Sequence, residues 1–184
     1  MSLTDSNMLE LGTEAPKFEL EDIITLKPIH LEDASNYIGT VIIFICNHCP
    51  YVIHLIAHLS SFAKKYQNKG FQFIAINSND VTKYIEDSPE KMIDFAKKYD
   101  LSFPYCFDET QEIAKAYHAA CTPDFYLFDT NLKLVYRGRY DSSRPQSTIP
   151  ITGSDLSHAL ESILHNESIS ELQYPSAGCN IKWK

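Results

Sequence analysis

The stretch FICNHCPYV, residues 44–52, places two cysteines three positions apart, Cys46 and Cys49, at the end of an apolar run. A run such as VIIFI at 41–45 suits a strand that is covered on both faces. From Cys49 onward the apolar residues recur at spacings of three and four, which predicts one face of a helix. FQFIAIN at 71–77 predicts the next strand. A strand, a helix and a strand in this order should give a parallel pair with a right-handed crossover.

Shorter elements are expected around this β-α-β unit. Further strands are expected at 18–20, 24–30, 103–106, 124–129 and 132–138, and further helices at 88–99, 108–118 and 156–164. The last two strands should form an antiparallel hairpin, and the polar segments 78–87 and 143–153 should be loops. The order predicts an α/β protein with a thioredoxin-like fold, a mixed central sheet flanked by helices. We expect one domain over 9–167 and a C-terminal tail over 168–184 that packs on it.

The composition excludes several classes of function. The chain has 184 residues, of which 44% are hydrophobic and 22% charged, as in an ordinary globular domain. Its net charge of −8 argues against a nucleic-acid or anionic membrane surface. The apolar runs are too short to span a membrane, and the start of the chain does not resemble a secretion signal. We therefore expect a cytoplasmic protein whose five cysteines are thiols rather than structural disulfides.

The spacing of Cys46 and Cys49 predicts a redox pair. With Cys46 just before the helix and Cys49 in its first turn, unpaired N–H groups and the helix dipole should stabilise a thiolate at Cys46. Such motifs lower a cysteine pKa from about 8.5 to between about 3.5 and 7.5. Cys49 should then resolve a mixed disulfide formed at Cys46. His48, if protonated, should stabilise the thiolate further and raise the reduction potential above roughly −270 mV, the value for thioredoxin.

Two plainer interpretations of the pair stay open. Two cysteines at this spacing also occur without any special role. A structural zinc site would need two more ligands at suitable spacing, and His118 and Cys121 lack the second Cys-x-x-Cys pattern. We therefore expect neither a bound metal nor an organic cofactor.

The stretch AACTPDFYLF, residues 119–128, predicts a second part of the site. A thioredoxin-like fold places a cis-proline loop, facing the cysteine pair, at a Thr–Pro that directly precedes an apolar strand. Pro123 should then pack near the pair, and the backbone of Thr122 can hydrogen-bond a bound chain. The alternative is a proline that merely starts a strand. Cys121 would lie within reach, either as another resolving thiol or as a small buried residue, and the second role is slightly favoured.

Other candidates are less specific. Cys106 on FPYCF suits the core, whereas Cys179 in the terminal GCNIKWK can resolve a sulfenic acid on Cys46 only if the tail reaches it. A charged cluster follows the last strand and can hold a substrate carboxylate or the tail, or be a solvated ion-pair patch. Its members are Arg137, Arg139, Asp141 and Arg144.

Taken together, these stretches resemble the peroxiredoxin-like branch of the AhpC/TSA–redoxin families, within the thioredoxin superfamily. The resemblance runs from LGTEAPKFEL at 11–20 to the terminal GCNIKWK, through FICNHCPYV, AINSND, DSPEKM and LVYRGRYDSSRP. It implies a thioredoxin core with an N-terminal β extension and an insertion after the second core strand.

The resemblance also restricts the chemistry. True peroxiredoxins carry Pro-x-x-x-Thr/Ser-x-x-Cys, and their peroxidatic cysteine matches Cys49. The hydroxyl position is then Cys46 and the proline position is Ile42, and reading the motif from Cys46 fails as well. The buried acid and the tryptophan of thioredoxin are matched by Thr40 and Ile45. The chain therefore departs from both standard patterns, and a peroxide reaction would rest on fold alone.

The sequence accordingly predicts a thiol–disulfide oxidoreductase that acts on protein or small-molecule thiols and disulfides. Cys46 is the expected nucleophile and Cys49 the expected resolving thiol. One alternative is an atypical thiol peroxidase with an antioxidant role, which would take peroxides. Another is a thiolate-based metal-binding or chaperone module that uses the pair with a histidine, because thiolates select Cu(I).

Overall fold

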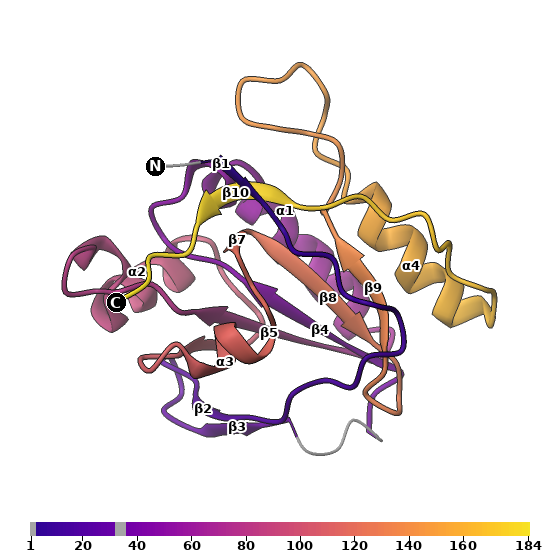
Figure 1. The fold of residues 1–184 in the computed structure, drawn as a ribbon, viewed down its shortest axis with the longest axis horizontal. Helices are drawn as coiled ribbons and strands as arrows, with labels where there is room; N and C mark the ends of the chain where they lie inside the picture. The colour runs from indigo at the N-terminus through magenta and orange to yellow at the C-terminus, as the bar shows by residue number, and fades with distance from the viewer. Residues whose placement is uncertain (1–2, 32–35) are drawn as a thin grey trace.

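A mixed five-stranded sheet forms the centre of the molecule (Figure 1). The computed structural model describes residues 3–31 and 36–184. The strand order is β6-β5-β4-β8-β9, in which β4 pairs in parallel with β5 and antiparallel with β8. The strands are β4 (Gly39–Phe44), β5 (Phe71–Asn77), β6 (Tyr105–Phe107), β8 (Asp124–Phe128) and β9 (Leu134–Gly138). This arrangement confirms the expected thioredoxin-like sheet, including its parallel start and antiparallel final hairpin.

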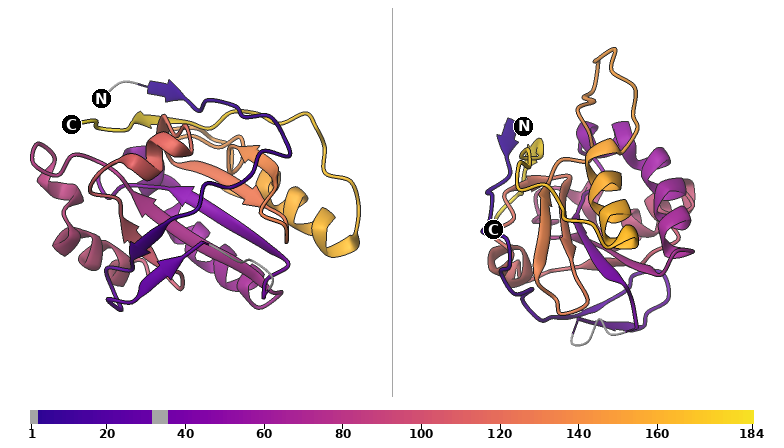
Figure 2. Two further views of the ribbon diagram at one scale, coloured as in Figure 1. Left: turned by 60° about the horizontal axis from the view of Figure 1, so that its bottom comes forward. Right: turned by 90° about the vertical axis from the view of Figure 1, so that its right-hand side faces the viewer.

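Helices cover both faces of the sheet (Figure 2). They are α1 (Pro50–Gln67), α2 (Pro89–Lys98), α3 (Glu112–Ala116) and α4 (Ser154–His165), with a 3₁₀ turn η1 (Ile85–Asp87). Alternate residues of β4 point to opposite faces, so Val41 and Ile43 pack against α1, α2 and α4. Ile42 and Phe44 pack on the other face with α3 and the N-terminal segment. None of the helices in the described ranges is long and apolar enough to cross a bilayer.

The start of α1 fixes the geometry of the cysteine pair. The helix begins at Pro50, and Cys49 occupies the N-cap position with an extended backbone. Proline suits the first turn because the N–H groups of that turn have no acceptor within the helix, so the absence of an N–H in proline costs no hydrogen bond. Lys64 and Lys65 lie in the last turn, where cations interact favourably with the helix dipole.

Both ends of the chain add strands outside the central sheet. β2 (Glu19–Glu21) and β3 (Pro28–His30) form the expected N-terminal hairpin. β10 (Ala177–Asn180) lies between β1 (Leu3–Asp5) and β7 (Cys121–Thr122), antiparallel to both. Figures 1 and 2 show this tail strand running beside the N-terminal segment. The tail carries no strand pattern in its sequence, because β10 reads AGCN and pairs only with strands that are distant in the chain.

Two further elements differ from expectation. The helix expected over 108–118 is reduced to α3, because Gln111 adopts a left-handed backbone conformation with φ 64°. Asp108 does not form a capping box there and instead accepts hydrogen bonds from the backbone N–H of Ala114 at 2.9 Å and from Ser78 Oγ at 2.8 Å. The segment 78–87 is a loop as expected, but it ends in η1, which contributes to the candidate site.

Candidate active site

Cys46 and Cys49 lie where β4 ends and α1 begins, and neither side chain is exposed. Their sulfur atoms are hydrogen-bonded to each other. Cys46 Sγ also lies 3.3 Å from Thr122 Oγ1, and Cys49 Sγ donates to the Thr122 carbonyl oxygen at 3.2 Å. The pair is therefore held against the strand β7, with both sulfurs in contact with one residue.

The loop that faces the pair is the predicted one. The Thr122–Pro123 peptide bond is cis, and Cys121 and Thr122 form β7. Cys121 is fully buried, with Sγ 3.9 Å from the Pro123 carbonyl oxygen, and burial raises the pKa of its thiol. This environment fits the small buried role that the sequence slightly favours for Cys121.

The two thiols of the pair differ in pKa, which is lowered at Cys49 and raised at Cys46. The hydrogen bond from the Cys46 thiol lowers the pKa of Cys49 to about 5, against the opposing effect of burial. The thiol of Cys179 and the backbone N–H of Val52 contribute further hydrogen bonds that lower the same pKa. These contacts lower the pKa of Cys49, whereas its 3.2 Å contact with the Thr122 carbonyl oxygen is a hydrogen bond that only the protonated thiol can donate.

The surroundings raise the pKa of Cys46, the residue on which the sequence predicts the thiolate. The hydrogen bond to Cys49 raises the pKa of Cys46 most, followed by burial and by the nearby Asp87 carboxylate. The position of the helix start contributes to this difference. Because α1 begins at Pro50 with Cys49 as its N-cap, the backbone N–H of Val52 lowers the pKa of Cys49.

His48 pairs with a buried aspartate, Asp87, which the sequence did not reveal. Its Nδ1 atom lies 2.7 Å from Asp87 Oδ2, and its ring stacks on Tyr84 with centroids 5.6 Å apart. The hydrogen bond to Asp87 raises the pKa of His48 most, burial lowers it, and the Cys49 thiolate raises it further. The sequence predicts that a protonated His48 stabilises a thiolate beside it. In the structure, the carboxylate of Asp87 pairs with His48 and offsets the positive charge of its imidazolium.

Asp87 is fully buried and is fixed by donors from two loops. Its carboxylate accepts hydrogen bonds from the backbone N–H of Asn47 at 2.8 Å and from Asn79 Nδ2 at 2.7 Å. The buried acid near the cysteine pair is therefore Asp87 of η1. The β4 position that matches the buried acid of thioredoxin is occupied by Thr40. The only sequence feature that marks Asp87 is its position just before Ser88 and Pro89, where α2 starts. That position indicates the start of a helix and not a functional site.

A mixed group of possible metal ligands is present at the same place. Cys46 Sγ, a nitrogen of His48 and an oxygen of Asp87 lie within 4.8 Å of one another. A structural zinc site has four ligands, usually of cysteine and histidine, and His48 Nδ1 already bonds to Asp87. The geometry thus favours an ion pair over a metal centre.

The C-terminal tail does reach the pair. Cys179 on β10 stands opposite Thr122 in the register of β7, and its thiol is hydrogen-bonded to Cys49. The contact is with Cys49 and not with Cys46, where the sequence interpretation had placed its target. Cys106 lies on β6 in the other core cluster, and burial raises its pKa to about 12.

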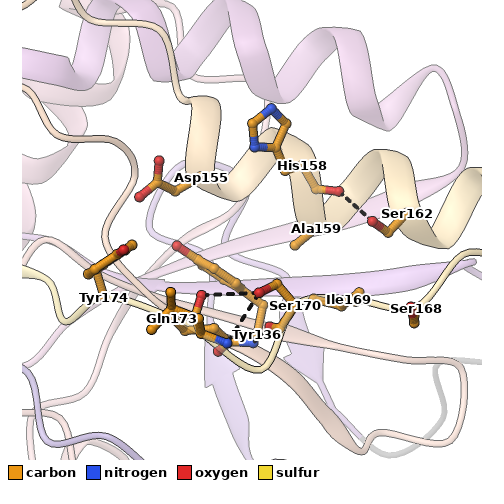
Figure 3. A pocket seen from close by; sticks show the side chains of 11 residues that line it. Tyr136, Asp155, His158, Ala159, Ser162, Ser168, Ile169, Ser170, Gln173 and Tyr174 are labelled. Carbon is orange, nitrogen blue, oxygen red and sulfur yellow. Dashed lines mark hydrogen bonds between the residues drawn. The ribbon is translucent and has the colours of Figure 1, made fainter.

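A separate cavity of about 400 Å³ lies between α4 and the segment that precedes β10. Figure 3 shows His158 and Ser162 on the helix side and Ser170 and Gln173 on the other. No cysteine lines it, so it is distinct from the cysteine pair. The hollow at the cis-proline loop, lined by Tyr51 among others, holds only about 20 Å³.

Comparisons with known proteins agree with this geometry. The thiol-disulfide oxidoreductase ResA of Bacillus thuringiensis subsp. konkukian is 27% identical over 143 residues, which cover 78% of each chain. A solved structure of an uncharacterized conserved protein from Geobacillus kaustophilus has a TM-score of 0.97 and 52% identity, covering 100% of this chain and 97% of that one.

A more distant structure places the fold. The thioredoxin domain of a thiol-disulfide oxidoreductase from Bacteroides vulgatus has a TM-score of 0.60 at 16% identity, covering 74% of this chain and 91% of that one. This likeness shows the fold alone. The AhpC/TSA family model matches residues 11–137, more than half of the chain. The chain therefore belongs to the AhpC/TSA family, on a thioredoxin-like fold.

Proposed function

We propose that this chain is a thiol–disulfide oxidoreductase whose Cys46–Cys49 pair cycles between dithiol and disulfide. The observation that carries the proposal is the contact of the two thiols at the start of α1, opposite Thr122 and Pro123. The likeness to ResA, a thiol-disulfide oxidoreductase, supports the same reaction class. Protein or small-molecule thiols and disulfides are the proposed partners.

We propose an order for the two sulfurs, supported by the lowered pKa of Cys49. Because the thiolate is the nucleophile, Cys49 attacks one sulfur of a substrate disulfide, and the other substrate sulfur leaves as a thiolate. This leaving thiolate takes a proton from the His48 imidazolium. Cys46 then attacks the Cys49 sulfur, and its proton goes to the second leaving thiolate. Two electrons pass to the substrate, and Cys46–Cys49 is left as a disulfide.

Trapping experiments test both the activity and this order. Cys46→Ser should lose multiple-turnover reduction of insulin and should accumulate a mixed disulfide on Cys49, because the resolving thiol is gone. Cys49→Ser should lose activity without trapping substrate, and Cys106→Ser should keep it. Full activity in the Cys46→Ser, Cys49→Ser double variant would overturn the proposal. A mixed disulfide trapped on Cys46 in Cys49→Ser would overturn only the order of attack.

A second candidate function is a thiol peroxidase with an antioxidant role. The favouring observation is that Cys49, the residue matched to the peroxidatic position, has a pKa lowered to about 5 by a hydrogen bond from Cys46. Stopped-flow mixing with hydrogen peroxide decides it. A second-order rate constant well above that of a free thiol, lost in Cys49→Ser, would support the peroxidase. A rate constant equal to that of a free thiol would exclude it.

We further propose a cytoplasmic location for the activity. Support comes from the count of five cysteines, an odd number that leaves one thiol unpaired under any scheme of disulfides within the chain. Fractionation of the host cell with alkylation of thiols at lysis should recover the chain in the cytoplasmic fraction. Recovery from an extracytoplasmic fraction would refute this location.

A further inference from the structure

The tail strand occupies the open edge of the cis-proline loop. β10 pairs antiparallel with β7, so that Cys179 stands opposite Thr122 and Asn180 opposite Cys121. An edge strand of this kind is where an extended polypeptide is captured by strand addition. In this protein the captured strand is β10 of the chain's own tail, which lies beside β7 (Figure 1). It carries Cys179 at the position opposite Thr122.

The backbone of β10 lies unusually close to the backbone of β7 at Gly178; we call this contact the seat of the tail strand. A Cβ atom on Gly178 would lie 2.0 Å from the Thr122 carbonyl oxygen, so only glycine fits there. Beyond β10 the tail is anchored to the body of the protein. The backbone N–H of Ile181 donates to the Ala120 carbonyl oxygen at 3.0 Å, and the N–H of Lys182 donates to Asn79 Oδ1 at 2.8 Å.

The seated strand brings a third sulfur to the pair. Cys179 is 3% exposed, and its thiol is hydrogen-bonded to Cys49. Cys49 is therefore in contact with two other thiols, Cys46 from its own loop and Cys179 from the tail. Cys106 and Cys121 have no such role in the hydrogen bonding of Cys49.

Resting on the proposed function, we infer that Cys179 is a third redox thiol that exchanges with the Cys46–Cys49 disulfide. The Cys179 sulfur attacks Cys49 Sγ, the Cys46–Cys49 bond breaks, and Cys46 leaves and takes the proton that Cys179 loses. The products are a Cys49–Cys179 disulfide and a Cys46 thiol, with no net change in oxidation state. The exchange ties the tail covalently across β7 and returns Cys46 to its thiol form.

Disulfide mapping at equilibrium tests the exchange. The full-length protein is equilibrated in glutathione redox buffers, quenched in acid and alkylated, and its disulfides are identified by mass spectrometry. The expected result is a population that contains Cys49–Cys179 with Cys46 alkylated. This population should vanish in Cys179→Ser and persist in Cys106→Ser. In Cys46→Ser, Cys49–Cys179 should exceed Cys49–Cys121 by about tenfold, because the thiol of Cys179 is hydrogen-bonded to Cys49.

A substitution at the seat separates position from reactivity. Gly178→Ala should cut the Cys49–Cys179 population severalfold while Cys46–Cys49 still forms, because the added Cβ forces β10 away from Thr122. The matched variant Ala177→Ser adds a comparable volume one residue earlier and should leave both disulfides unchanged.

The possible failures are distinguishable. If only Cys46–Cys49 forms in the wild type, and Cys49 links to glutathione or Cys121 in Cys46→Ser, the role of Cys179 is overturned and the proposed function stands. If Cys46–Cys49 itself fails to form in any buffer, the proposed function falls with it.

Discussion

At the scale of residues, the N-cap of α1 is the position at which the pKa of a thiol is lowered. Cys49 occupies that position because Pro50 starts the helix, and hydrogen bonds from two thiols and two backbone N–H groups lower its pKa. Cys46 lies outside the helix start and near the Asp87 carboxylate. A Cys-x-x-Cys motif alone fixes the spacing of the sulfurs but leaves their charges to the residues around them.

Thiolate absorbance should report this asymmetry. The reduced protein should show a thiolate signal at about 240 nm that titrates with an apparent pKa of about 5, because the Cys46 thiol stabilises the Cys49 anion. Cys49→Ser should remove the signal, and Cys106→Ser should retain it. A reduced protein whose first thiol titrates at about 8.5, like an ordinary cysteine, would refute the assignment.

The His48–Asp87 pair should make stability depend on pH. The folded-state pKa of His48 is raised, so its contribution is full below the unfolded value of about 6.5 and is lost as pH rises through the folded-state pKa. Asp87→Asn should lower the His48 pKa, measured by NMR of the imidazole protons, and remove this part of the pH dependence of the free energy of unfolding. An unchanged His48 titration in Asp87→Asn would contradict the pairing.

At the scale of elements, β8 and β9 are joined by a buried ion pair. Arg137 and Asp124 are both fully buried, and Arg137 Nη2 lies 3.2 Å from Asp124 Oδ2 and 2.6 Å from the hydroxyl of Tyr126. Burial raises the pKa of Asp124 to about 7, and Arg137 opposes that rise. Arg137 was expected in a solvated patch or a substrate clamp, whereas it is among the largest fully buried side chains.

Removing the arginine should therefore be costly. Arg137→Met should lower the free energy of unfolding by about 3–5 kcal/mol, because it leaves Asp124 buried without its cation. The matched variant Lys133→Met breaks the exposed pair with Glu14, at 3.3 Å, and should cost less than about 1 kcal/mol. Urea denaturation measures both. Equal losses in the two variants would show that burial of the pair is unimportant.

The elements also show what the sequence could predict. β4, α1 and β5 follow from local patterns, since an unbroken apolar run and a 3.6-residue period each indicate one structure. The cis peptide bond at Thr122–Pro123 could be predicted because this Thr–Pro directly precedes an apolar strand. The roles of Asp87 and β10 could not be predicted from local sequence. Asp87 is a polar residue that acquires its role by accepting a hydrogen bond from the distant Asn47, and β10 is a short strand that forms only by pairing with distant strands.

At the scale of the whole molecule, strands from both ends of the chain, β1 and β10, pair in one small sheet with β7, the strand that contacts the cysteine pair. β10 lies between β1 and β7, and the tail beyond it buries Ile181, which is 1% exposed. Both cysteines of the pair are inaccessible while the tail is seated. Reaction with a protein substrate should therefore require the tail to move from β7.

Loosening the tail should expose the pair. Ile181→Ala should lower stability by about 2–4 kcal/mol and speed alkylation of Cys49 by about tenfold or more, because the cavity weakens the anchor beyond β10. Leu172→Ala, at a tail residue that is 71% exposed, should change neither quantity. Mass spectrometry after timed iodoacetamide labelling gives the rates. Equal rates in the two variants would show that the tail does not control access.

The most direct measurement is a redox titration of the full-length protein against glutathione buffers, with every disulfide identified by mass spectrometry. The expected result is a reversible two-electron transition in which Cys49 becomes linked, chiefly to Cys46, while Cys106 stays a thiol. A protein that keeps Cys46 and Cys49 as thiols across the whole range of potentials, or links them irreversibly, would contradict it.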